Sequence, residues 1–243
     1  MISLIALHLK NQRPRNILKM NHLLEIACFN MQSAIMAQRA GADRIELCDD
    51  SASGGTTPSF ETIKEARELI SIPLFVMIRP RRGNFMYSDS EFEEMKNAVI
   101  FCRKNKVDGI VSGILTEENL VDKQRCTTLV ELAKPMPATF HRAFDETDSS
   151  FAELEEVIDC GFDRILTSGQ KSSALEGASF ISLLIEKANE RIVIMPGGGV
   201  RAENISELKK KTRAKEFHSS AINIQTRLPD ESEIREMKKL IFL

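Results

Sequence analysis

Short apolar runs alternate with longer stretches of helical periodicity along nearly the whole chain. Apolar runs bounded by Gly, Pro or polar residues are typical of buried strands. They predict eight strands: Leu23–Cys28, Arg44–Cys48, Leu74–Arg79, Gly109–Ile114, Ala138–His141, Arg164–Ser168, Ile192–Met195 and Lys215–Ser219. The periodic stretches between them predict eight helices: Met31–Ala40, Ser59–Ile70, Ser88–Lys104, Asp122–Ala133, Ser150–Cys160, Ala178–Asn189, Ala202–Lys211 and Asp230–Leu240.

This strict alternation indicates parallel strands that are joined by right-handed crossovers. Eight such units in a chain of 243 residues favour a closed barrel over an open sheet, because a (β/α)8 barrel takes about 250 residues. The predicted fold class is therefore α/β, a TIM-type (β/α)8 barrel in a single domain that covers residues 23–243. Residues 1–22 are predicted to be a loosely ordered N-terminal extension.

Alternation within each strand decides which side chains enter the barrel, because successive residues point to opposite faces. In the second strand Ile45 and Leu47 should pack against helices. The side chains that then face the barrel interior are Arg44, Glu46 and Cys48. By the same rule, the fifth and eighth strands send these residues inward: Thr139, His141, Glu216 and His218.

The predicted interior is unusually charged, whereas barrel interiors normally hold layers of branched apolar side chains. Buried charges must pair, so four residues near the amino ends of strands are predicted to form a structural ion network at the barrel floor: Glu25, Arg44, Arg164 and Glu216. The carboxyl ends of the strands carry the active sites of this fold. The residues expected at that mouth are Cys48, Arg79, His141, Arg142, Ser168, Gly197, Gly198, Gly199 and His218.

The stretch Ala138–Asp145 places an imidazole and a guanidinium side by side at the end of a strand, where packing has no use for them. Arg79 and Arg142 should disfavour a further positive charge nearby. The pKa of His141 is therefore expected below ~6.5, which leaves the ring neutral near pH 7. The alternative is a hydrogen bond from His141 to Glu46 or Glu216, which would raise its pKa and make it a structural cation.

Composition excludes several classes of function. The formal net charge of −2 gives no electrostatic case for nucleic acid or an anionic membrane. No apolar run approaches the ~18 residues of a membrane span, and Met1–Leu9 has the reverse charge order of a signal peptide. Five widely spaced cysteines without a CxxC pair indicate reduced thiols in a cytoplasmic protein. The sequence leaves open whether the chain forms a homo-oligomer.

Several motifs make the sequence similar to a known family. They are the segments 41–48, 54–59, 75–81, 139–145, 164–169, 194–200 and 217–221, which read GADRIELC, GGTTPS, FVMIRPR, TFHRAFD, RILTSG, IMPGGGV and FHSSA. In this order they closely resemble the CutC family, named for copper homeostasis. The resemblance implies a TIM-type barrel, a cytoplasmic location and Cu(I) binding, with Cys48 as the residue that matches the family's second-strand cysteine.

The sequence departs from the family pattern in two places. Many members have a cysteine two residues after the first-strand glutamate, where this chain has Ala27. Cys28 follows one residue later, so alternation points its thiol toward the helices, away from Cys48. The segment Ile222–Leu228 is also shorter than is usual in the family, which should remodel one wall of the mouth.

Two functions remain as candidates. The first is a copper-homeostasis role with Cu(I) held by Cys48, because thiolates suit this soft ion. The second is an enzyme that acts on a small anionic, for instance phosphorylated, metabolite, with His141 and Glu46 as catalytic residues. The ligand-binding residues would then be Arg79, Arg142, Ser168, Gly197, Gly198, Gly199 and His218, with the glycine triplet after the seventh strand offering N–H groups to a phosphate.

Overall fold

The computed structural model describes residues 22–148 and 150–242, so the predicted extension 1–22 lies outside the described residues except for His22. The strands are β1 Leu23–Cys28, β2 Arg44–Leu47, β3 Leu74–Met77, β4 Gly109–Ser112, β5 Ala138–Phe140, β6 Arg164–Thr167, β7 Val193–Pro196 and β8 Glu216–Ser219. The helices are α1 Met31–Ala40, α2 Phe60–Leu69, α3 Asp89–Lys104, α4 Lys123–Ala133, α5 Ser150–Asp159, α6 Ala178–Ala188, α7 Ile205–Thr212 and α8 Glu231–Phe242.

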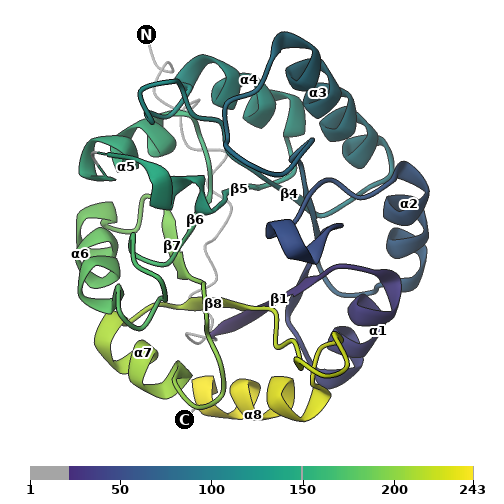
Figure 1. Ribbon diagram of the computed structural model, residues 1–243, viewed down its shortest axis with the longest axis vertical. Helices are drawn as coiled ribbons and strands as arrows, with labels where there is room; N and C mark the ends of the chain where they lie inside the picture. The colour runs from purple at the N-terminus through teal and green to yellow at the C-terminus, as the bar shows by residue number, and fades with distance from the viewer. Residues whose placement is uncertain (1–21, 149, 243) are drawn as a thin grey trace, which may run out of the picture.

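The strands form one parallel sheet that curls into a barrel. Their order is β7-β6-β5-β4-β3-β2-β1-β8, with every recorded pairing parallel. The two end strands, β7 and β8, lie next to each other, and the helices form a ring around the strands (Figure 1). The prediction of a single-domain TIM-type (β/α)8 barrel is confirmed.

Local chemistry explains where the helices begin and end. Asn30 caps α1 by accepting the N–H of Ser33 at 2.8 Å, and Gly41 ends this helix in the left-handed conformation. Ser88 and Glu91 form a capping box at the start of α3. Such side chains satisfy backbone groups that the first and last turns leave without partners.

Helix α7 begins three residues later than its sequence predicts, whereas the other starts agree to within one residue. The pattern placed its start at Ala202, whereas α7 begins at Ile205. The side chain of Asn204 accepts the N–H of Arg201 at 2.9 Å and donates to the carbonyl of Gly199 at 2.8 Å. These bonds hold residues 201–204 in a turn, because a local side-chain partner competes with the helical backbone bond.

Strand alternation sorts the core into two parts. Ile45, Leu47 and the thiol-bearing Cys28 belong to the large cluster that packs against the helices. A small separate cluster lies inside the barrel and contains Cys48, Phe75, Met77 and Val111. Among the described helices, none has the length and apolar character needed to cross a membrane.

Candidate functional site

A cavity of about 750 Å³ opens at the carboxyl ends of the strands. Its wall is built from strand ends and from segments that follow β2, β3, β4, β5, β7 and β8. Six of the residues predicted for the mouth line this single cavity together with the candidate catalytic residue Glu46: Arg79, His141, Arg142, Gly198, Gly199 and His218. The structure therefore brings together side chains from β2, β5 and β8 that are far apart in sequence, while their chemical roles stay predictions.

Three predicted residues lie behind this wall. Cys48 is 1% exposed and faces the barrel interior beneath Gly55. Ser168 is buried, and its hydroxyl lies 3.1 Å from Arg142 and 3.0 Å from Asp145. At Gly197 an added Cβ would come within 2.3 Å of Leu166 on β6 and within 3.2 Å of His218 on β8, so this glycine permits close packing between these two side chains.

His141 follows β5 directly and begins the short 3-10 helix η2, Arg142–Glu146. Its Nδ1 accepts the backbone N–H of Ala143 at 3.2 Å. The ring lies against Gly113, where an added Cβ would come within 2.6 Å of Nδ1. The sequence of β5 and η2 thus fixes the ring by a backbone contact, and the alternative of a bond to Glu46 or Glu216 is not what the structure has.

Burial and the positive charge of Arg79 lower the pKa of His141 to about 3. The direction agrees with the sequence-based expectation, although burial is the larger cause. A neutral ring that accepts at Nδ1 carries its proton on Nε2. This Nε2 has no hydrogen-bond partner within residues 22–148 and 150–242. In the wall of the cavity, His141 therefore holds a buried N–H donor without a partner among the described residues.

Arg79 ties together the two loops that follow β2 and β3. Its guanidinium donates to the carbonyls of Ser53 and Gly55 at 2.9 and 3.1 Å, and to that of Gly83 at 2.8 Å. Phe85 covers the same guanidinium, with 4.7 Å between Cζ and the ring centroid. Most N–H groups of Arg79 thus donate to backbone carbonyls. Its buried Nε is the nitrogen without a partner in the described part of the chain.

Glu46, His218 and Glu25 meet on the inner side of the cavity. His218 Nδ1 lies 2.7 Å from Glu25 Oε1, and His218 Nε2 lies 3.9 Å from Glu46 Oε2. Burial raises the pKa of Glu46. Burial would lower the pKa of His218, but the negative charges of Glu46 and Glu25 outweigh it and raise that pKa. The Glu46–His218 pair consequently holds a proton more tightly than either residue would alone.

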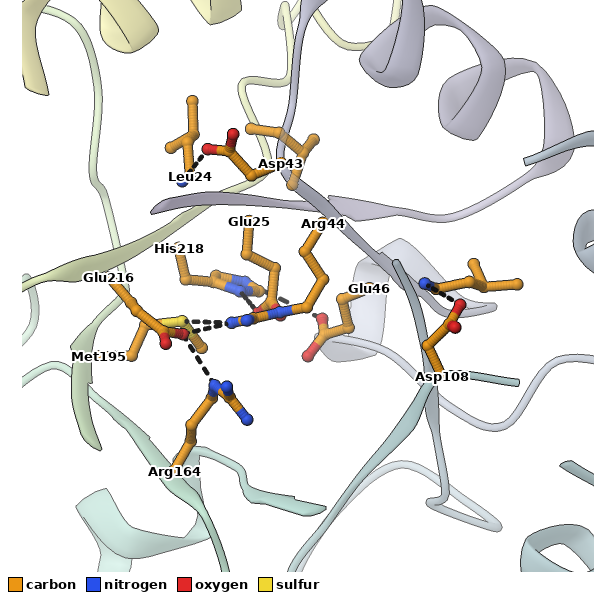
Figure 2. A network of polar contacts seen from close by, with 12 residues as sticks. Leu24, Glu25, Asp43, Arg44, Glu46, Asp108, Arg164, Met195, Glu216 and His218 are labelled. Carbon is orange, nitrogen blue, oxygen red and sulfur yellow. Dashed lines mark hydrogen bonds and ion pairs between the residues drawn. The ribbon is translucent and has the colours of Figure 1, made fainter. Parts of the chain in front are cut away.

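The predicted ion network at the barrel floor is confirmed. Arg44 donates to Glu25 and, at 2.7 Å, to Glu216, which also pairs with Arg164 at 2.8 Å. Figure 2 shows these side chains pointing toward one another inside the barrel, together with His218. The ring of Phe75 contacts both guanidinium groups, with centroid distances of 4.7 and 5.5 Å. The network thus places two carboxylates against two cations, with Glu25 and Arg44 buried and Glu216 and Arg164 partly exposed.

Two residues that shape the mouth were missed by sequence reasoning. The ring of Phe85 lies 4.8 Å from that of His141, centroid to centroid, in a loop without any periodic pattern to find it by. Asp145 accepts from Arg142 at 2.8 Å and from the N–H of Ser168 at 3.0 Å. Asp145 lies within a recognised motif, so that motif was a usable signal. It directs Arg142, whose side chain is 46% exposed, along the rim of the cavity.

The thiols of Cys28 and Cys48 do not point to a common place where they could bind one Cu(I) ion. The Cys28 thiol points to the carbonyl of Ile26 at 3.5 Å, within the cluster that faces the helices. The Cys48 thiol lies inside the barrel, 3.3 Å from Glu46 Oε2. Burial and nearby carboxylates raise the pKa of both thiols. Two inward thiolates, which would suit Cu(I), are therefore not what this pair of cysteines provides.

Comparison with known proteins shows extensive similarity to one family. The model of the CutC family matches residues 22–223. The human copper homeostasis protein cutC homolog is 47% identical over 199 residues, which cover 82% of this chain and 73% of the relative. A CutC family protein of Parabacteroides distasonis is 45% identical over 206 residues, which cover 84% of this chain and 85% of the relative.

Solved structures agree with the fold. The crystal structure of a CutC protein from Streptococcus agalactiae superposes with a TM-score of 0.78 at 36% identity, over 82% of this chain and 98% of that one. A phosphoribosylanthranilate isomerase of Thermotoga maritima superposes with a TM-score of 0.61 at 13% identity, over 91% and 98% of the two chains. The latter likeness shows the shared barrel alone.

Proposed function

This chain belongs to the CutC family, and we propose that its barrel mouth binds a small anionic molecule and performs acid–base chemistry on it. One observation carries the proposal. Three buried polar atoms, Glu46 Oε1, Arg79 Nε and His141 Nε2, have no partner among the described residues, and all three side chains line the same cavity. Buried polar groups are normally hydrogen-bonded, so three unpartnered groups in the wall of one cavity favour a polar ligand at that wall.

The geometry suggests a role for each group. Glu46 is the proton acceptor, because its raised pKa brings it toward the pH at which a carboxylate base works well. His141 donates from Nε2 to an oxygen on which negative charge develops, since its low pKa keeps the ring neutral. His218 balances the charge of Glu46. Arg142 stands at the rim with Gly198 and Gly199, where the anionic group of the ligand would be held.

Cu(I) binding is the second candidate. It is favoured by the name copper homeostasis protein, which curated relatives carry, and by the Cys48 thiol that faces the barrel interior beside Glu46. A single thiol with a raised pKa would give a weaker site than a thiolate pair. For either function we propose a cytoplasmic location, which five free cysteines support.

Calorimetry with inorganic phosphate, glycerol phosphate and malonate tests the proposal for the cavity. We expect saturable one-to-one binding of at least one of these anions. Arg142→Ala should weaken it at least tenfold through loss of the rim cation. Glu46→Gln should change the affinity and the proton uptake that accompanies binding.

Arg103→Ala is the matched control, because Arg103 donates to the carbonyl of Leu132 between helices α3 and α4, outside the cavity. It should bind the anions as the unmodified protein does. Binding that Arg142→Ala and Arg103→Ala weaken equally would place the anion on the outer surface and defeat the proposal.

A further inference from the structure

The inner wall of the cavity gathers oxygen and nitrogen atoms in the manner of a metal centre. Glu25, Glu46 and His218 each offer one ligand atom, and these atoms all lie within 4.8 Å of one another. They come from three neighbouring strands, β1, β2 and β8, so the register of the sheet fixes their spacing. Figure 2 shows His218 and Glu46 on either side of Glu25.

Glu25 orients the imidazole. Its Oε1 accepts a hydrogen bond from His218 Nδ1, 2.7 Å away, and its Oε2 accepts one from Arg44. The proton of a neutral ring therefore stays on Nδ1, and the lone pair of Nε2 is directed to the side of Glu46, 3.9 Å away. Metal-bound histidines almost always donate their second N–H to a carboxylate, a backbone carbonyl or a water in this way.

Glu46 has the spare ligand atom. Its side chain is 4% exposed. Its Oε2, which lies 3.9 Å from His218 Nε2, accepts only from the Cys48 thiol at 3.3 Å, and its Oε1 has no partner in the part of the chain that the structure describes. A buried carboxylate oxygen without a partner is costly, and a bound cation would compensate it.

The local charges favour a cation at this place. Glu25 and Glu216 are matched by the two arginines of the floor network, Arg44 and Arg164. Neither arginine forms an ion pair with Glu46 within residues 22–148 and 150–242. Its negative charge consequently remains for His218 or for a metal ion to balance.

We propose that Glu46 and His218 form a binding site for a divalent first-row transition-metal ion at the inner end of the cavity, with Glu25 and Cys48 as positioning residues. One imidazole nitrogen and one carboxylate suit ions such as Zn²⁺ better than Cu(I), which prefers sulfur. The cavity leaves the remaining coordination positions open. The cation and the proposed proton acceptor use the same carboxylate, so cation binding and proton transfer at Glu46 exclude each other.

Titration of the full chain with Zn²⁺ by calorimetry tests the site. We expect one-to-one binding that His218→Gln and Glu46→Gln each weaken at least tenfold. Glu25→Gln should weaken it between tenfold and a hundredfold, because outer-shell partners of metal ligands have effects of this size. His22→Gln removes a histidine outside the cavity and should leave the Zn²⁺ affinity unchanged.

Co²⁺ absorption then separates direct ligands from positioning residues. We expect d–d bands that disappear in His218→Gln, without a sulfur-to-cobalt charge-transfer band. Such a band, lost in Cys48→Ser, would make Cys48 a ligand and overturn its assignment. Zn²⁺ binding that is absent, or that survives both His218→Gln and Glu46→Gln, would overturn the site.

Circular dichroism identifies any variant that fails to fold, in which case His218→Asn or Glu46→Ala takes its place with the same expectation. Failure of the metal site is distinguishable from failure of the proposed anion site. The metal titration contains no organic ligand. The anion site is tested with the variant Arg142→Ala, and Arg142 is not part of the metal site.

Discussion

At the scale of single residues, the barrel mouth holds two histidines in opposite electrostatic surroundings. His141 has a backbone N–H and Arg79 beside it, whereas His218 has two carboxylates. Cations and burial disfavour a protonated ring, and carboxylates favour it. The pKa values of the two rings are therefore shifted in opposite directions although both rings line one cavity.

We predict that His141 remains neutral throughout the physiological pH range, because its surroundings lower its pKa to about 3. Histidine NMR titration measures this, and His141→Asn assigns the signal. A folded-state pKa below the ordinary 6.5 means that the unfolded chain takes up the proton first. Stability that depends on neutral His141 is complete above pH 6.5 and is lost as the pH falls, by about 1.4 kcal/mol per pH unit.

The control is the acid dependence of unfolding in His141→Asn, which should be shallower between pH 6 and pH 4 than in the unmodified protein, a window of roughly two units below the ordinary pKa. A measured pKa at or above ~6.5, unaffected by phosphate, would contradict the donor role and favour a structural cation.

How far the sequence predicts the site follows from where each residue lies. Alternation along β2, β5 and β8 was enough to place Glu46, His141 and His218 at the mouth, because strand faces obey a period of two. Phe85 and the loop carbonyls that hold Arg79 lie in segments without a period. Their positions depend on tertiary contacts that no local pattern encodes.

At the scale of elements, helix limits were predictable wherever a capping residue marks them. Asn30, Gly41 and Ser88 stand at such positions and act there by local bonds. The start of α7 was not predictable from periodicity, because Asn204 bonds to Arg201 and Gly199 before the helix begins. Predicted helix boundaries are wrong where a side chain offers the backbone an alternative hydrogen-bond partner.

The alternation of β1 also leads to a prediction about Cu(I) binding. Cys28 and Cys48 lie on opposite faces of neighbouring strands, while Ala27 is paired with Glu46 and lines the cavity. We predict that Cu(I) binds weakly in competition with a Cu(I) chelator. We further predict that Ala27→Cys strengthens this binding at least tenfold, because it supplies a second inward thiol.

Cys28→Ser is the matched control for Ala27→Cys and should leave Cu(I) affinity unchanged, since its thiol faces the helices. Tight one-to-one binding that is lost in both Cys28→Ser and Cys48→Ser would show that the two thiols share a face, contrary to the structure.

At the scale of the whole molecule, the ion network connects strands from opposite ends of the sheet order. Glu25 is on β1, Arg44 on β2, Arg164 on β6 and Glu216 on β8. Its contacts therefore span the interior, including the side where β7 and β8 close the barrel (Figures 1 and 2). Each charge is held by a partner on another strand, so the loss of one partner leaves a buried charge uncompensated.

We predict that Arg44→Met lowers the free energy of unfolding by about 3–5 kcal/mol, the usual cost of removing one partner of a buried pair. Glu216 keeps Arg164, so the carboxylate that loses its only arginine is Glu25, which keeps His218 alone as a partner among the described residues. The double variant Arg44→Met/Glu25→Gln removes this charge and should recover more than half of the loss. Urea unfolding followed by circular dichroism measures both.

Arg191→Met, which breaks an exposed pair with Glu155, should hardly move the unfolding midpoint. An Arg44→Met midpoint no lower than that of Arg191→Met would show that the barrel does not depend on its charged floor.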